Sequence, residues 1–169
     1  DPKVYLPNYV LNRISSAKSS LLSSEEYARN SEILDADARS GRPMISEIFM
    51  RYNARLRNAD AMDFDDLLYY MNVLLRDFPE VLYKYQNRYR YILVDEYQDT
   101  NFAQYLIVKK LAAAHHNLCV VGDDAQSIYA FRGANIQNIL NFRRDYPEAA
   151  TVKLEQNYRS TSNIVNAAN

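Results

Sequence analysis

The sequence predicts an α/β fold in which an all-helical part precedes a parallel sheet with helices. Three observations predict it. Apolar side chains recur at helical spacing through roughly the first 80 residues, three short apolar runs alternate with helical segments after Tyr89, and polar residues follow each run. Such alternation is typical of a parallel sheet, in which ligands bind beyond the carboxyl ends of the strands. We therefore expect a helical subdomain at residues 1–80 and an α/β part at residues 81–169.

The composition is that of an ordinary globular protein. The chain has 169 residues, of which 48% are hydrophobic and 24% are charged, and its formal net charge is −1. These values exclude disordered, collagen-like and globally basic nucleic-acid-binding proteins. No apolar stretch approaches the roughly 18 residues of a membrane helix, so we expect no membrane partner. The single cysteine, Cys119, favours a cytoplasmic location, and its place within an apolar run predicts a small buried side chain.

The clearest helix of the first part begins near residue 45. Its apolar face carries Ile45, Ile48, Phe49, Tyr52 and Leu56. Asp63 predicts the N-cap of a helix that runs to residue 78, and Pro79 predicts the start of another at 79–89. The serine-rich segment 15–27 is a weaker helix candidate because serine side chains compete for backbone hydrogen bonds. Residues 39–43, with the sequence RSGRP, predict a loop.

The second part contains three predicted strands, at 91–94, 118–121 and 151–154. Residues 101–116, between the first two strands, have the length and composition of a helix. Parallel strands joined by a helix end at the same edge of their sheet. We therefore expect the polar residues that follow these strands to open onto one edge.

The first polar group is the pair Asp95 and Glu96, directly after the strand predicted at 91–94. Mg²⁺ prefers oxygen ligands and is usually held by one or two carboxylates together with phosphates. A neighbouring carboxylate can accept a proton from water that attacks a phosphate. Asp95 is therefore the candidate metal residue and Glu96 the candidate general base. The alternative is a solvated acidic turn after a buried strand.

The second group follows the strand predicted at 118–121 and occupies residues 122–134. Gln126 is a neutral amide of the kind that orients water or contacts a terminal phosphate in nucleotide hydrolases. Tyr129, Phe131 and Arg132 form an aromatic and cationic cluster. Such clusters suit single-stranded nucleic acid, because bases stack on rings and phosphates pair with arginine. The alternative is core packing by the two rings beside a surface charge.

The third group is the segment 154–160, with the sequence LEQNYRS. Arg159 is a candidate for stabilising charge on a transferring phosphoryl group, and Tyr158 is a candidate for stacking on a base. Taken alone, the segment is more typical of a surface loop that carries a salt-bridged arginine.

In their order along the chain, the three groups resemble motifs II, III and IV of UvrD/Rep/PcrA-type superfamily 1 DNA helicases. The matching segments are VDEYQDT at 94–100, VVGDDAQSIYAFRGA at 120–134 and LEQNYRS at 154–160. The segment DFDDLL at 63–68 also resembles the text that precedes motif II in this family. Phe131 stands where relatives commonly have tryptophan, and Ala125 replaces an acid that often precedes the glutamine.

The resemblance implies a role for each candidate residue in binding or hydrolysing Mg-ATP. Asp95, with Glu96 beside it, would lie at the magnesium ion, and Glu96 would activate the attacking water. Gln126 would sense the γ-phosphate and link hydrolysis to the DNA strand. Arg159 would contact the γ-phosphate, and Tyr158 would stack on the adenine.

The resemblance also implies partners and a place in a larger protein. Tyr129 and Phe131 would lie against bases of single-stranded DNA, with Arg132 supporting that contact. Residues 81–169 resemble the later part of the RecA-like motor domain 1A, of P-loop NTPase type, and residues 1–80 resemble subdomain 1B. No GxxxxGK[ST] phosphate loop occurs among these residues, which include only three glycines. We therefore expect the partners to include the Walker A segment and the second RecA-like domain of the same motor.

The expected function is that of a segment of an ATP-dependent 3′–5′ DNA helicase that acts on single-stranded DNA and on junctions of single- and double-stranded DNA. By itself the segment is expected to be catalytically inactive. A second hypothesis is a metal-dependent nuclease, whose carboxylates would be Asp95, Glu96, Asp99, Asp123 and Asp124. A third is a non-enzymatic module that binds DNA or protein through the helical part.

Overall fold

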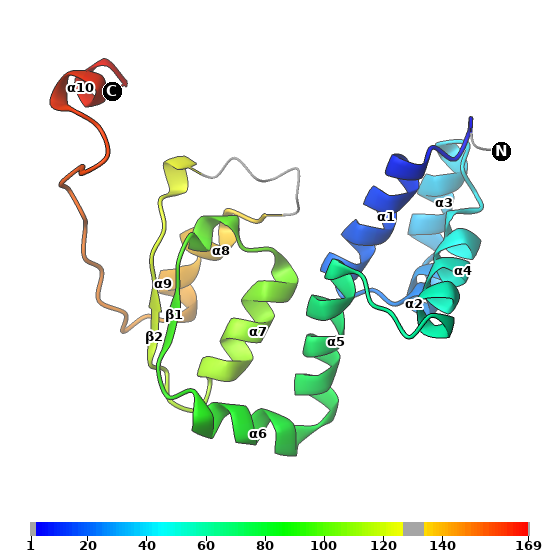
Figure 1. Ribbon diagram of the computed structural model, residues 1–169, viewed down its shortest axis with the longest axis horizontal. Coiled ribbons are helices and arrows are strands. Elements are labelled where there is room, and N and C mark those ends of the chain that lie inside the picture. Colours follow the sequence, from blue (N-terminus) through cyan, green and yellow to red (C-terminus); the bar gives the residue numbers. More distant parts are fainter. Residues whose placement is uncertain (1–2, 127–133, 169) are drawn as a thin grey trace.

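The computed structural model describes residues 3–126 and 134–168 (Figure 1). Four helices form the N-terminal part: α1 (Pro7–Ser19), α2 (Ser24–Arg29), α3 (Ser31–Arg39) and α4 (Ile45–Asn58). Side chains from α1, α2 and α4 fill one apolar core, which comprises Val10, Ile14, Ala17, Tyr27, Ile45 and Phe49. Within it, the rings of Tyr27 and Phe49 meet edge to face at 5.8 Å between centroids.

The serine-rich segment 15–27 is not a single helix, so the weaker prediction for it is only partly correct. The backbone turns at Leu21, whose φ is 58°, and α2 begins three residues later. Ser23 and Glu26 form a capping box, in which each side chain accepts a hydrogen bond from the other residue's backbone N–H. Ser23 therefore marks a helix boundary. This agrees with the tendency of serine side chains to bond backbone groups at helix ends. The loop predicted at 39–43 is confirmed except for Arg39, which ends α3, and Gly41 within it has a φ of 74°.

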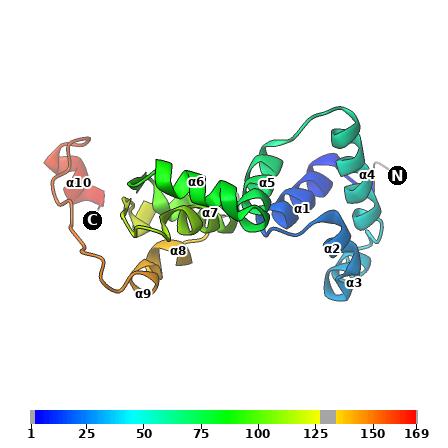
Figure 2. The ribbon, with the colours of Figure 1, turned by 90° about the horizontal axis from the view of Figure 1, so that it is seen from below.

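Two further helices, α5 (Phe64–Asp77) and α6 (Pro79–Arg88), follow as the sequence predicts. Asp63 caps α5 in a second capping box, and proline opens α6. Helix α5 contacts both α1 and α7 (Phe102–Ala112), and it lies between them in both views (Figure 1, Figure 2). The Asn72 side-chain N–H donates to the Ala103 carbonyl of α7 at 2.9 Å. Helix α5 thus packs on both sides of the domain boundary predicted near residue 80.

The two strands β1 (Ile92–Val94) and β2 (Leu118–Val120) pair in parallel, and α7 connects them. In this part of the chain, the structure is mostly helical with a small parallel sheet, which agrees with the coarse α/β prediction. Asn101 caps α7, and the helix ends at Ala112, four residues earlier than the predicted segment. His116, with a φ of 54°, turns the backbone before β2.

The prediction of a strand at 151–154 is wrong. These residues are neither helix nor strand, and they lie on an extended segment between α9 (Phe142–Asp145) and α10 (Ser162–Ala168) that runs away from the sheet (Figure 1). Val152 and Leu154 are 80% and 83% exposed. A strand requires backbone pairing with a neighbour, and residues 151–154 make no backbone hydrogen bond to either described strand.

The prediction that Cys119 is buried is also wrong, because this residue is exposed. Its side chain shares a face of the sheet with that of Leu93, which is 77% exposed. The alternate residues of each strand are partly buried, and α7 packs against β1. A three-residue apolar run therefore has one covered and one uncovered face here. None of the helices in residues 3–126 and 134–168 combines the length and apolar character needed to traverse a bilayer.

A buried ion cluster joins α1 to the start of α5. The Lys18 side chain is 2% exposed, and its Nζ lies 2.7 Å from carboxylate oxygens of both Asp63 and Asp66. The Tyr52 hydroxyl donates to Asp63 at 2.8 Å. Burial alone would raise the pKa of Asp63, but hydrogen bonds from Lys18, the Asp66 backbone and Tyr52 lower it overall. Burial, together with the bond to Asp63, raises the pKa of Tyr52 to about 12.

We predict that Lys18→Met lowers the free energy of unfolding by about 3–5 kcal/mol, because two carboxylates then lose their buried cation. Urea unfolding of the chain measures this change. Arg51→Ala is the control, since its ion pair with Glu47 is exposed and is worth at most about 1 kcal/mol. Equal losses in the two variants would contradict the importance of the buried cluster.

Candidate active site at the carboxyl ends of the strands

The two strands end side by side, which confirms that the first polar group and residues 122–126 of the second open onto one edge. Val94 pairs with Val120, and the ladder extends one step further because Val121 N–H donates to the Val94 carbonyl at 2.8 Å. A short 3₁₀ turn follows each strand: η1 (Tyr97–Asp99) after β1 and η2 (Asp124–Gln126) after β2. Tyr97 N–H in turn donates to the Val121 carbonyl at 2.9 Å. The backbone itself therefore joins the two turns.

Asp95 and Glu96 lie at the tip of β1, and both are exposed. Glu96 adopts a left-handed backbone conformation with a φ of 50° and a ψ of 43°. One Asp95 oxygen accepts a hydrogen bond from the Glu96 N–H at 2.9 Å. One Glu96 oxygen accepts from the side-chain N–H of Gln98 at 2.7 Å. Among the described residues, no hydrogen bond is made to the second oxygen of either carboxylate.

The donor set at this tip fits a magnesium ion. Mg²⁺ takes hard oxygen ligands and keeps several positions for water and substrate phosphates. Asp95 and Glu96 each present an uncommitted oxygen on an exposed edge, as a site shared with a phosphate ligand requires. In the described part of the chain, no group of three or more histidine, cysteine or acidic residues gathers where it could hold a metal.

Gln126 lies at the end of the turn that follows β2, and its side chain is held by Asp123. The Gln126 side-chain N–H donates to Asp123 Oδ2 at 2.7 Å, and the Ala125 backbone N–H donates to Asp123 Oδ1 at 3.0 Å. Both residues of the side-chain pair are exposed. Asp123 therefore organises its own turn, with both of its oxygens engaged inside it.

A residue that the sequence analysis did not single out, Gln98, belongs to the turn after β1, and its side chain reaches the turn after β2. Its side-chain oxygen accepts from the Asp123 N–H at 3.1 Å, while its side-chain N–H donates to Glu96. Only 1% of Gln98 is exposed. The absence of a side chain at Gly122 makes this possible, because a Cβ there would stand 2.6 Å from the Gln98 side-chain oxygen. A glycine directly after a predicted strand was the one sequence signal for such a close approach.

Helices α8 (Gln137–Leu140) and α9 pack against the turn after β1. The Asn138 side-chain N–H, in α8, donates to both the carbonyl and the hydroxyl oxygen of Thr100, at 3.0 and 3.1 Å. Tyr97 is 1% exposed, and its ring meets Phe142 of α9 edge to face at 5.7 Å. Burial raises the pKa of the Tyr97 phenol. These buried contacts fix the backbone from which Glu96 and Gln98 project.

The structure does not join Tyr158 or Arg159 to the strand ends. Both lie on the extended segment before α10 (Figure 1), and Tyr158 is 93% exposed. The Asn157 side chain accepts from the backbone N–H groups of Arg159 and Ser160, at 2.8 and 2.9 Å, so the turn is stabilised locally. The predicted DNA-contact residues Tyr129, Phe131 and Arg132 lie outside the described residues.

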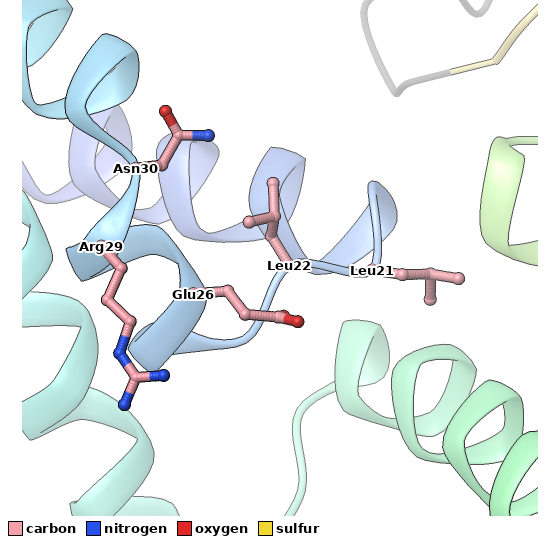
Figure 3. Close-up of a pocket in the computed structure, with 5 residues that line it drawn as sticks. All are labelled: Leu21, Leu22, Glu26, Arg29 and Asn30. Carbon is pink, nitrogen blue, oxygen red and sulfur yellow. The ribbon is translucent and has the colours of Figure 1, made fainter.

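A surface hollow lies elsewhere, on the helical part (Figure 3). It measures about 390 Å³ and is lined by Leu21, Leu22, Glu26, Arg29 and Asn30. Glu26 is already used there in the capping box of α2. The hollow contains none of the strand-end residues, so the candidate chemistry is placed by side-chain type and hydrogen bonding rather than by cavity size.

Comparison with known proteins identifies the family of this chain. The family model described as "UvrD/REP helicase N-terminal domain" matches residues 2–147. Similar proteins include "ATP-dependent DNA helicase PcrA" of Leuconostoc citreum and of Bacillus subtilis (strain 168), each 47% identical over 169 residues. The protein of the same name from Staphylococcus epidermidis (strain ATCC 12228) is 48% identical.

The chain spans about a fifth of the length of these curated relatives. Each comparison covers 100% of this chain and 22% of the relative. The family match itself covers most of the chain, including both strand-end turns. The chain therefore belongs to the UvrD/REP helicase family, whose N-terminal domain it matches.

Proposed function

We propose that this chain supplies one half of the ATP-hydrolysis site of a DNA helicase. One observation carries the proposal: the acidic tip of β1 and the Gln126 turn after β2 lie on the same sheet edge and are bonded to each other. A carboxylate pair beside a neutral amide is the arrangement that positions a metal-bound triphosphate and the water that attacks it. The relatives that carry the same segment are described as ATP-dependent DNA helicases.

In this proposal, each strand-end residue has a separate task. Asp95, with Glu96 beside it, holds the magnesium ion, which supplies neutralisation of phosphate charge when bound. Glu96 accepts the proton of the attacking water through its uncommitted oxygen. Gln126 contacts the γ-phosphate, and its turn leads directly into the segment proposed to bind DNA.

The remaining roles follow from family membership. Arg159 would contact the γ-phosphate and Tyr158 the adenine, while Tyr129, Phe131 and Arg132 would bind single-stranded DNA. Residues 1–80 are proposed to be subdomain 1B and residues 81–169 the later part of the RecA-like domain 1A. The other partners would be the Walker A segment, the second motor domain and DNA junctions. Unwinding with 3′–5′ polarity and a cytoplasmic location belong to the same proposal.

The hydrogen bonds at the strand ends favour this function over a metal-dependent nuclease. A two-metal nuclease site needs several carboxylates that converge on the metals with free oxygens. Asp123 has neither oxygen free, since one accepts from Ala125 and the other from Gln126. Asp99 Oδ1 has no hydrogen-bond partner but is buried, whereas Asp95 and Glu96 are exposed and each keeps an uncommitted oxygen. The exposed pair fits a single magnesium ion that is shared with a nucleotide.

Replacing the candidate base tests the proposal most directly. The test protein is the Bacillus subtilis relative in which this chain replaces the aligned 169 residues, hereafter the chimera. We expect Glu96→Gln to abolish DNA-stimulated ATP turnover while ATP still binds, because the amide cannot accept the water proton. Phosphate release and equilibrium nucleotide binding measure the two effects. Glu80→Gln, on an exposed first turn of α6, should retain turnover; normal hydrolysis by Glu96→Gln would remove the base from the proposal.

The proposed DNA contact predicts a loss of affinity in the chimera with Phe131→Ala. Loss of a stacked ring should weaken binding of a single-stranded oligonucleotide by about 1–3 kcal/mol, or roughly 5- to 150-fold in Kd. Fluorescence anisotropy at fixed salt measures it. Phe64→Ala is the control, because this ring on α5 is 90% exposed. Weakening by Phe64→Ala instead would favour binding through the helical part.

The 169-residue chain by itself should show negligible ATPase activity. Most ground-state contacts to a triphosphate come from a Walker A loop, and these residues contain no GxxxxGK[ST] sequence. A coupled phosphate-release assay with and without single-stranded DNA makes the test. DNA-stimulated turnover by the chain would mean that its phosphate contacts have another origin.

A further inference from the structure

Gln98 differs from the other polar residues of the strand ends in being fully enclosed. It is 1% exposed, whereas Asp95, Glu96, Asp123 and Gln126 are all exposed. A buried amide must satisfy its polar atoms, because a donor or acceptor that is buried without a partner destabilises the fold. Gln98 does so with one bond to each strand-end turn: its N–H donates to the Glu96 carboxylate at 2.7 Å, and its oxygen accepts from the Asp123 backbone at 3.1 Å.

The surroundings of Gln98 leave it little freedom. A Cβ placed on Gly122 would stand 2.6 Å from its side-chain oxygen, 3.3 Å from its backbone nitrogen and 2.9 Å from the Ile139 side chain. The amide therefore fills the space between the turn after β1 and the start of the turn after β2. Its backbone is anchored as well, because the neighbouring Tyr97 is buried and bonded to Val121.

The chemistry of the side chain matches this position. A glutamine amide donates and accepts at once and carries no charge, so one residue can bond a carboxylate on one side and an N–H on the other. A glutamate in its place can accept from Asp123, but when ionised it cannot donate to Glu96. A leucine fills a similar volume and makes neither bond.

We propose that Gln98 is a positioning residue that fixes the Glu96 carboxylate relative to the turn carrying Asp123 and Gln126. The inference rests on the proposed function, since it assigns Gln98 a task in the same site. The exposed Glu96 side chain would otherwise sample several rotamers, most of which point away from the attacking water. Through the bonds Glu96–Gln98–Asp123–Gln126, the candidate base and the candidate γ-phosphate contact keep a fixed relation.

The experiment compares two substitutions of Gln98 in the chimera. Gln98→Leu should lower kcat for DNA-stimulated ATP hydrolysis by about 10- to 100-fold, the usual cost of removing a group that orients an active-site ligand. The KM for ATP should stay within about twofold, because ground-state binding is not touched. Gln98→Glu keeps the shape and the Asp123 contact but sets a second carboxylate against Glu96. It should lose kcat similarly, whereas a role in packing alone predicts that this isosteric variant keeps it.

A double-mutant cycle shows whether Gln98 acts through Glu96. Adding Gln98→Leu to Glu96→Gln should cause no further loss in the residual single-turnover rate, since the group to be positioned is already gone. Gln104→Leu is the matched control: it removes a glutamine side chain from the capping box of α7, where it should lower the Tm and leave kcat unchanged.

The outcomes separate this inference from the proposed function. Loss of kcat in both Gln98 variants, unchanged KM and a non-additive cycle would support the positioning role. Full kcat in Gln98→Glu, or fully additive losses, would overturn it while leaving an inactive Glu96→Gln variant as support for the hydrolytic site. Normal hydrolysis by Glu96→Gln would overturn both, because Gln98 would then have no base to position.

Discussion

The parallel pairing of β1 with β2 decides where Asp95, Glu96 and Gln126 lie relative to one another. Each strand has only three residues, yet the register that sets Val94 against Val120 places the two following turns next to each other. The turns are then bonded through the backbone and through Gln98. A shift of one residue in this register would turn the covered side chains outward and separate Glu96 from Asp123. The site therefore depends on a small number of ladder bonds that buried neighbours protect.

Helix α5 connects that sheet to the helical part through two different kinds of interaction. At its N-terminal end, the buried Lys18 ammonium is shared by Asp63 and Asp66. Further along, the Asn72 side chain bonds the carbonyl of Ala103 on α7. Each charge of a buried cluster needs its partner, because a buried charge without one lowers the free energy of unfolding. The bond from the Asn72 amide to a backbone carbonyl requires the two helices to lie close together. Together these contacts make α5 a shared structural element of both parts.

Local sequence signals predicted the elements whose causes are local. Asp63 and Pro79 begin helices because their capping and φ preferences act within one turn. The strands 92–94 and 118–120 lie within apolar runs that end in polar residues. The segment 151–154 has similar apolar residues but pairs with neither described strand, so propensity alone does not make it a strand. The prediction that Cys119 is buried failed for a related reason, since the exposure of a side chain depends on which face of the sheet is covered.

The residues of the candidate site also fall into those that local sequence signals predict and those that depend on contacts between distant segments. Asp95, Glu96 and Gln126 were predicted because their residue types and places after strands carry chemical meaning. Gln98 was missed because its role depends on Gly122 and Asp123, which are distant in sequence and close only in the fold. A buried amide between two turns leaves no periodic pattern that a sequence reading can detect.

The left-handed backbone at Glu96 lowers the stability of the fold at a position whose side chain is needed for the proposed chemistry. A non-glycine residue at a φ of 50° carries a conformational cost of order 1–3 kcal/mol, which a glycine at this position would largely avoid. Optimisation of this domain for thermostability alone would therefore replace the very side chain proposed to perform hydrolysis. The fold tolerates the strained conformer because the surrounding ladder and buried contacts hold it.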